Sequence, residues 1–119
     1  APSTVAEVLQ AHEERRSNHT LRSVIEHRAL TCHNDTPRHW HEPDTERPSI
    51  DPARVRGAIN EWRAAKGSYI DVHAWYFTPE SFNEIIGLLD HLDLISLTVE
   101  RIYSTRFGSN EFWTILKKE

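Results

Sequence analysis

One stretch, FTPESFNEIIGLLDHL at residues 77–92, constrains the fold most, because it carries the signals of an amphipathic helix. Thr78 is a good N-cap and Pro79 suits the first helical position. Phe77 can pack across this start onto the first turn. The apolar residues that follow recur at helical spacing, namely Phe82, Ile85, Ile86, Leu89 and Leu92. The sequence therefore predicts a helix that buries one face.

The segments on both sides of this helix predict β-structure. After it, ISLTVERIYSTRFGSNEFWTILKKE reads as two strands joined around residues 108–110, which predicts an antiparallel hairpin. Before it, YIDVHAWYF at residues 69–77 is rich in β-branched and aromatic residues, which predicts a strand. The C-terminal part should therefore run strand, helix, hairpin.

Helix signals also occur upstream. Thr4 with Glu7 forms a capping-box pattern, and a short apolar stripe predicts a second helix at residues 21–30 with Asn18 or Thr20 as its cap. A third helix should begin at the Asp51 N-cap and end at Gly67. The residues expected to form its buried stripe are Val55, Ile59 and Trp62. Ile50, just before the N-cap, should pack onto Val55 as a hydrophobic staple.

These elements predict an α+β fold in which three to four helices pack on a small sheet that includes the C-terminal hairpin. We expect one domain, since 119 residues can bury roughly 65% of the unfolded surface. Its parts are a helical region at 1–30, a polar His-rich loop at 31–49 and a helix-strand-helix-hairpin region at 50–119. Three prolines and the loss of periodicity mark the loop.

Composition excludes several classes of partner. The net charge of −4 gives no electrostatic reason to bind nucleic acid, which requires clustered Lys and Arg. No apolar run approaches the length of a membrane span, and the first residues do not read as a signal peptide. The single cysteine, Cys32, cannot form an internal disulfide, which suits a reducing cytoplasm.

The C-terminal segment from Asp71, DVHAWYFTPESFNEIIGLLDHLDLISLTVERIYSTRFGSNEFWTILKKE, resembles the final part of bacterial class I S-adenosylmethionine-dependent methyltransferases. In that family the last helix is followed by an antiparallel strand pair at the edge of a seven-stranded sheet. The upstream strings STVAEVLQAHEERR and SVIEHRALTCHNDTPRHW look like an insertion that some members carry before this ending. The resemblance implies a methyltransferase-like C-terminal module.

The cofactor half of that family has no counterpart here. Such enzymes hold the cofactor on a glycine-rich turn, whereas the four glycines of this chain are widely separated. The resemblance therefore implies no cofactor-binding residue and no methyl transfer by this chain alone. Without that half, a sheet edge is left unpaired, and exposed edges recruit partners. We expect a homodimer, or a protein partner that completes the sheet.

The segment TCHNDTPRHWHEPD at residues 31–44 offers a second hypothesis. Its histidines are His33, His39 and His41, with a cysteine and acidic residues beside them, and these are ligand types that suit zinc. The chain would then be a small metal-binding protein or metal-dependent enzyme. Alternatively, the segment is a polar connection that Trp40 anchors against the core.

Two further sets of residues are candidates. Asp71 and His73 lie two apart on the predicted strand, where a carboxylate beside an imidazole can prepare a general base. Alternatively, they form a structural pair that fixes the strand to the preceding helix. Trp62, Trp75 and Trp113 could line a pocket for a small apolar ligand, although aromatic residues more often form the core.

Overall fold

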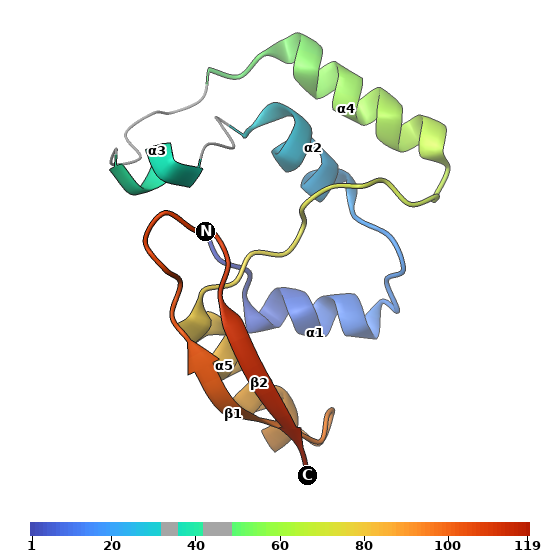
Figure 1. Ribbon diagram of the computed structural model, residues 1–119. Coiled ribbons are helices and arrows are strands. Elements are labelled where there is room, and N and C mark those ends of the chain that lie inside the picture. The colour runs from blue at the N-terminus through green and yellow to red at the C-terminus, as the bar shows by residue number, and fades with distance from the viewer. Residues whose placement is uncertain (32–35, 42–48) are drawn as a thin grey trace. The chain divides into compact units, whose positions relative to one another are not determined.

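The structure is a computed structural model that describes residues 1–31, 36–41 and 49–119. Within these residues the chain forms five helices and one two-stranded antiparallel sheet, which confirms the predicted α+β class (Figure 1). The elements are α1 (Val5–Glu13), α2 (Leu21–Ala29), α3 (Thr36–His41), α4 (Pro52–Ala65), α5 (Pro79–His91), β1 (Leu97–Tyr103) and β2 (Trp113–Lys118). No helix in the described part of the chain is long and apolar enough to cross a membrane.

The chain divides into two compact units, which we describe in turn. Unit one combines Ala1–Gln10, Thr36–Glu42 and Trp75–Glu119, whereas unit two combines Ala11–Asp35 and Pro43–Ala74. The chain passes from unit two to unit one between Ala74 and Trp75.

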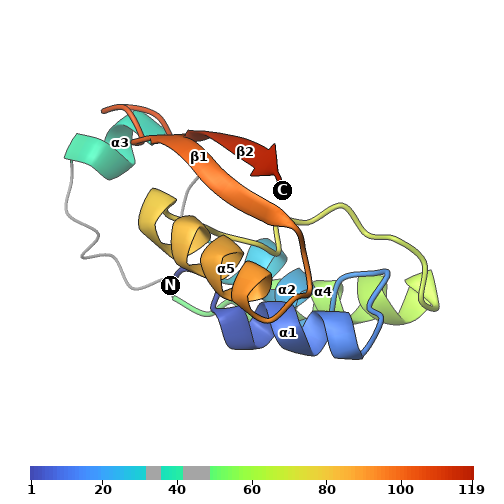
Figure 2. The ribbon, with the colours of Figure 1, turned by 90° about the horizontal axis from the view of Figure 1, so that it is seen from below.

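The hairpin and α5 form the centre of unit one. β1 and β2 pair antiparallel, with Val99 opposite Leu116, and Gly108 has a φ of 82° in their connection. This confirms the predicted hairpin. α5 packs against one face of the strand pair (Figure 2) and buries Ile85 and Ile86 there.

The start of α5 matches its sequence signals. The Thr78 hydroxyl accepts a hydrogen bond from the Ser81 N–H at 3.1 Å, and the Ser81 hydroxyl accepts one from the Thr78 N–H at 2.9 Å. This reciprocal box satisfies two amide donors that a helix start leaves without partners. The Phe77 ring meets the Phe82 ring edge-on at 5.8 Å, which confirms the predicted staple.

The N-terminus of unit one is also fixed by caps and hydrogen bonds. The predicted capping box at α1 forms, because the Glu7 carboxylate accepts from the Thr4 N–H at 2.7 Å. The buried Ser3 donates its N–H to the Tyr76 carbonyl at 2.7 Å. In return, the Ser3 hydroxyl accepts the Tyr76 N–H at 3.1 Å.

Unit two is built on the packing of α2 against α4. Thr20 caps α2 and Asp51 caps α4, as predicted, by accepting backbone N–H groups of the first turn. The buried cluster at this contact consists of Val24, Ala58, Ile70 and Val72.

The predicted buried stripe of α4 is partly wrong. Ala58, which the sequence did not single out, is the buried residue of this helix, whereas Trp62 is 41% exposed. A small side chain at the contact lets two helices approach closely, which leaves the bulky indole one turn further on at the rim. Ile50 is 67% exposed, so it does not make the predicted staple.

The predicted strand at residues 69–77 is wrong. Within the described residues the sheet has two strands, and this segment belongs to neither. The alternation of apolar and polar residues in this segment nevertheless decides which side chains are buried. Ile70 and Val72 are buried. Tyr69, Asp71 and His73 are exposed. The apolar side packs on α2 and α4 rather than beside another extended segment, so no backbone ladder forms.

The predicted loop at residues 31–49 contains a helix, α3. Its six residues are too few to display a 3.6-residue periodicity, and Pro37 is tolerated because it lies in the first turn. Trp40 holds α3 to the hairpin connection, where its Nε1–H donates to the Ser109 carbonyl at 2.7 Å and its ring lies 5.2 Å from that of Phe107. The suggested anchoring role of Trp40 thus has a structural basis.

Candidate functional site

We call the segment of residues 69–74 the connector. A cluster of polar side chains surrounds it. Tyr69, Asp71 and His73 lie on its exposed side. The Tyr69 hydroxyl donates to a carboxylate oxygen of Asp71 at 3.2 Å. The negative charge of Asp71 and this hydrogen bond raise the pKa of the Tyr69 hydroxyl above its ordinary value.

His73 is placed against His27 of α2. The backbone N–H of His73 donates to Nδ1 of His27 at 3.2 Å, and the two rings meet edge-on with their centroids 5.1 Å apart. Burial, followed by the nearby Arg28 guanidinium, holds the pKa of His27 below its ordinary value. His27 is therefore neutral at neutral pH.

Arg28 joins three parts of unit two. Its Nε and Nη2 atoms donate to the two carboxylate oxygens of Glu61 on α4, each at 3.1 Å. Nη2 also donates to the Asp71 carbonyl at 3.2 Å, so the same side chain ties the connector to both helices. The hydrogen bond from Arg28 lowers the pKa of the Glu61 carboxyl.

This cluster is arranged to anchor rather than to hold a metal. Because Nδ1 of His27 accepts a hydrogen bond, the proton of its neutral ring lies on Nε2. A histidine that ligates a metal through Nε2 normally donates its Nδ1–H to a second group, which is the opposite arrangement. The Asp71 carboxylate is engaged by Tyr69, and the general-base role of Asp71 and His73 stays a prediction.

The His-rich candidates are only partly described. His33 lies outside the described residues, as does the side chain of His39, although its backbone belongs to α3. The His41 ring meets the Phe107 ring edge-on at 5.2 Å. In the described part of the chain, no three side chains of ligand type gather around one point. The zinc site therefore stays a prediction.

The hairpin carries a second candidate site on the face away from α5, which we call the outer face. Tyr103 lies opposite Trp113 in the register, and Arg101 lies opposite Ile115. Trp113 is 73% exposed, and Tyr103 and Ile115 are each 44% exposed. Arg101 donates to the Tyr103 hydroxyl at 3.3 Å, which holds the cation beside this apolar surface.

The two strands differ at their edges. The register of β1 shifts between Val99 and Arg101, which marks a bulge, whereas β2 pairs without interruption from Trp113 to Lys118. Bulges twist an edge away from further pairing. β2 therefore offers the more regular edge for an additional strand.

The three candidate pocket tryptophans have different surroundings. Trp62 lies on α4 in unit two, whereas Trp75 and Trp113 belong to unit one. The Trp75 ring is stacked nearly parallel to Phe77 with centroids 6.3 Å apart. From there the rings continue in a row through Phe82 to Phe112, which lies 5.7 Å from Phe82. This row fills the space between the α5 start and the hairpin, while Trp113 points outward.

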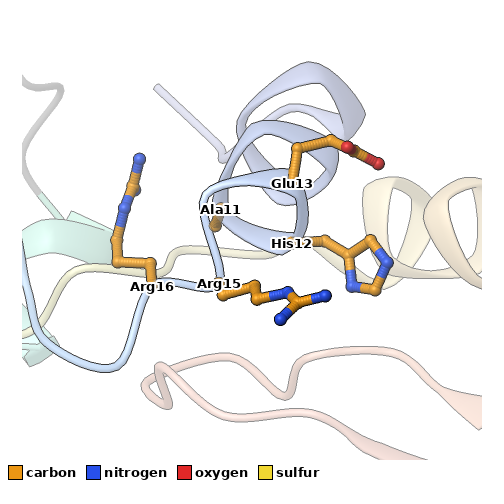
Figure 3. A pocket seen from close by; sticks show the side chains of 5 residues that line it. All are labelled: Ala11, His12, Glu13, Arg15 and Arg16. Atoms are coloured by element: carbon orange, nitrogen blue, oxygen red, sulfur yellow. The ribbon is translucent and has the colours of Figure 1, made fainter.

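An open pocket of about 520 Å³ lies at the C-terminal end of α1 (Figure 3). Its charged lining residues point in different directions, with His12 and Arg15 on one side and Arg16 on the other. The lining residues are Ala11, His12, Glu13, Arg15 and Arg16. His12, Glu13 and Arg15 are exposed, and the half-buried Arg16 is paired with Glu14. Among the described residues no fully buried polar side chain lines the pocket, so it offers little to fix a ligand.

Sequence reasoning missed His27, Arg28 and Glu61. A signal for His27 was present, because it lies three residues after Val24 and so continues the apolar stripe of α2. The partners of Arg28 are far away in the sequence, and no local pattern links α2 to residues 61 and 71.

Comparison with known proteins assigns no family. A scan against protein-family models, a search of the curated proteins and a search of the solved structures each find no significant match. Function therefore has to be inferred from the chain's own residues.

Proposed function

We propose that the chain is a non-catalytic docking module, the C-terminal module of a methyltransferase-like protein. Its hairpin would attach to a partner that presents a sheet edge and carries the S-adenosylmethionine site. The single observation that supports this best is the uncovered side of the hairpin, where the regular edge of β2 borders an outer face with an exposed Trp113.

Two physical arguments favour docking at this surface. The outer edge of a strand presents backbone N–H and C=O groups that can pair with another strand. A sheet that joins a parallel α/β sheet is also covered on both faces, and α5 covers only one face of this hairpin. A partner of that class would pair with β2 and bury Tyr103, Trp113 and Ile115 together.

The chemistry of the outer face suits a partner with apolar side chains and some carboxylates. Arg101 and Lys117 flank the exposed aromatic residues on the same side of the strands. Cations at the rim of an apolar patch favour a partner with acidic residues around an apolar centre. Among possible partners for this surface we choose the cofactor-binding half of a methyltransferase, because the C-terminal segment of the chain resembles the final part of such enzymes.

The test uses the isolated cofactor-binding half of a bacterial class I methyltransferase as the probe. The mass of the chain, of the probe and of their mixture is measured by light scattering, and the affinity by titration calorimetry. We expect a one-to-one complex, which Trp113→Ala should weaken at least about fivefold because an interface aromatic residue contributes more than about 1 kcal/mol. Trp62→Ala on α4 is the matched control and should change nothing.

The alternative outcomes separate the possible occupants. A mass of two chains without the probe, reduced to one by Trp113→Ala, would replace the proposed partner with a second copy. A mass of one chain at all micromolar concentrations, with no complex in the mixture, would overturn the docking proposal.

A further inference from the structure

The connector leads from unit two directly into unit one at Trp75. Ile70 and Val72 enter the core beside Val24. Beyond them along the chain, the His73 N–H donates a hydrogen bond to Nδ1 of His27 on α2. One hydrogen bond at this end of the connector therefore depends on a side chain that can change its charge.

That hydrogen bond requires a neutral imidazole. In neutral His27 the Nδ1 atom has a lone pair that accepts the His73 N–H. Protonation places a hydrogen on Nδ1, so two N–H groups would point at each other at 3.2 Å. The imidazolium ring therefore cannot keep the contact, and either the ring turns away or the connector moves.

Within the described residues, the charged and titratable groups that act on His27 lie on α2, on α4 and on the connector. Arg28 on α2 and His73 on the connector disfavour a positive charge there, whereas Asp71 on the connector and Glu61 on α4 favour it. Burial adds to the unfavourable side and is the largest contribution. The balance lowers the pKa of His27 in the folded state.

This lowering fixes the pH range in which the attachment weakens. Above the ordinary histidine pKa of about 6.5, the ring is neutral in both folded and unfolded chains, and the contact is fully present. We call the connector closed when the His73 N–H is bonded to His27 and open when it is not. Below the ordinary pKa, His27 is protonated in the open state but remains neutral in the closed state, so closure becomes less favourable as the pH falls towards the folded-state pKa.

We propose that His27 and His73 form a pH-sensitive latch, in which the connector is held against α2 at neutral pH and released in mild acid. Release would break the hydrogen bond from the His73 N–H and so loosen the connector shortly before the chain enters unit one. The proposal is independent of the docking function, since every residue of the latch belongs to unit two.

The latch is tested by amide hydrogen exchange of His73 in the whole chain, measured by NMR between about pH 7.5 and about pH 5 and corrected for the intrinsic pH dependence of exchange. Protection should fall on acidification, by up to tenfold per pH unit between the ordinary histidine pKa and the lowered folded-state pKa of His27, and should level off below the latter. In His27→Asn, an amide oxygen can take the place of Nδ1 without titrating, so the protection should persist and be independent of pH. In His27→Leu, the protection should be low throughout.

His91→Asn, on α5 in unit one, is the matched control and should behave as the unaltered chain does. The latch is overturned if the unaltered chain keeps the same His73 protection over the whole range. It is also overturned if His27→Asn retains the original pH dependence. Amides of α4 report whether each variant remains folded.

Discussion

The hairpin and the connector share an alternating pattern of apolar and polar residues but have different structures. Both turn the apolar side inward: Leu116 is half-buried in the hairpin, and Val72 is buried in the connector. In the hairpin each strand has a neighbour, supplied by a turn at Gly108. The connector packs against helices α2 and α4 instead. Alternation therefore predicts which side chains are buried, whereas strand pairing also requires a second extended segment within reach.

The two regions consequently differ in what stabilises them. The hairpin combines a ladder of backbone hydrogen bonds with the cover of α5. The connector instead buries Ile70 and Val72 and has hydrogen bonds with His27 and Arg28. Because side-chain contacts take the place of a backbone ladder here, single substitutions in the connector should have large effects.

The largest effect is expected for Ile70→Ala. Ile70 is 9% exposed within the core of unit two, and truncation of a buried isoleucine to alanine costs about 2–4 kcal/mol. The free energy of unfolding is measured in urea, with exchange of α2 and α4 amides as the probe of unit two. Ile50→Ala is the matched control, since Ile50 is 67% exposed and its truncation should cost less than about 0.5 kcal/mol. Equal losses at both positions would show that burial does not hold the connector.

Two glycine-to-alanine substitutions in unit one should change the stability in opposite directions. Gly108→Ala places a side chain at a φ of 82°, which costs about 1 kcal/mol, because only glycine adopts this conformation readily. Gly87 lies inside α5 with open space around it, so Gly87→Ala should stabilise by about 0.5–1 kcal/mol. Thermal unfolding followed by circular dichroism measures both. A stabilising Gly108→Ala would mean that the hairpin register does not depend on its turn.

Local signals account for the elements that the sequence predicted correctly. Thr78, Thr20 and Asp51 cap helices within three residues of the groups that they satisfy, and the hairpin closes around a nearby glycine. The failures at residues 69–77 and at α3 arose where the outcome depended on distant residues. α3 is held by a hairpin connection 69 positions away, at the Trp40 contact with Ser109.

The candidate site was less predictable for the same reason. The sequence placed Asp71 and His73 on one side of an extended segment, and the structure has both on the exposed side. It gave no hint that His27 would meet His73, because these residues are 46 positions apart. A single sequence displays residue types and periodicity, but it does not display which helix face an extended segment will meet.

The smallest effect is expected for Glu61→Gln, which weakens the ion pair that supports the connector through Arg28. Both side chains are more than a third exposed, so solvent screens the pair and the loss at neutral pH should be only about 0.5 kcal/mol. The folded-state pKa of Glu61 is lowered by Arg28, so its contribution is present above the ordinary pKa of about 4.5. The contribution is lost as the pH falls through the folded-state value.

The unaltered chain and Glu61→Gln should therefore differ in stability at neutral pH and converge as the pH falls through the folded-state pKa of Glu61, as urea unfolding at each pH would measure. Glu26→Gln is the matched control, because Glu26 pairs with Arg22 within α2 rather than with Arg28. If both variants lost the same stability, the Arg28 bridge would contribute no more than an ordinary surface pair. A larger loss for Glu61→Gln, together with faster exchange at His73, would instead show that the connector is held from α4 as well as from α2. The hairpin, which holds itself by its own ladder, should be unaffected by either change.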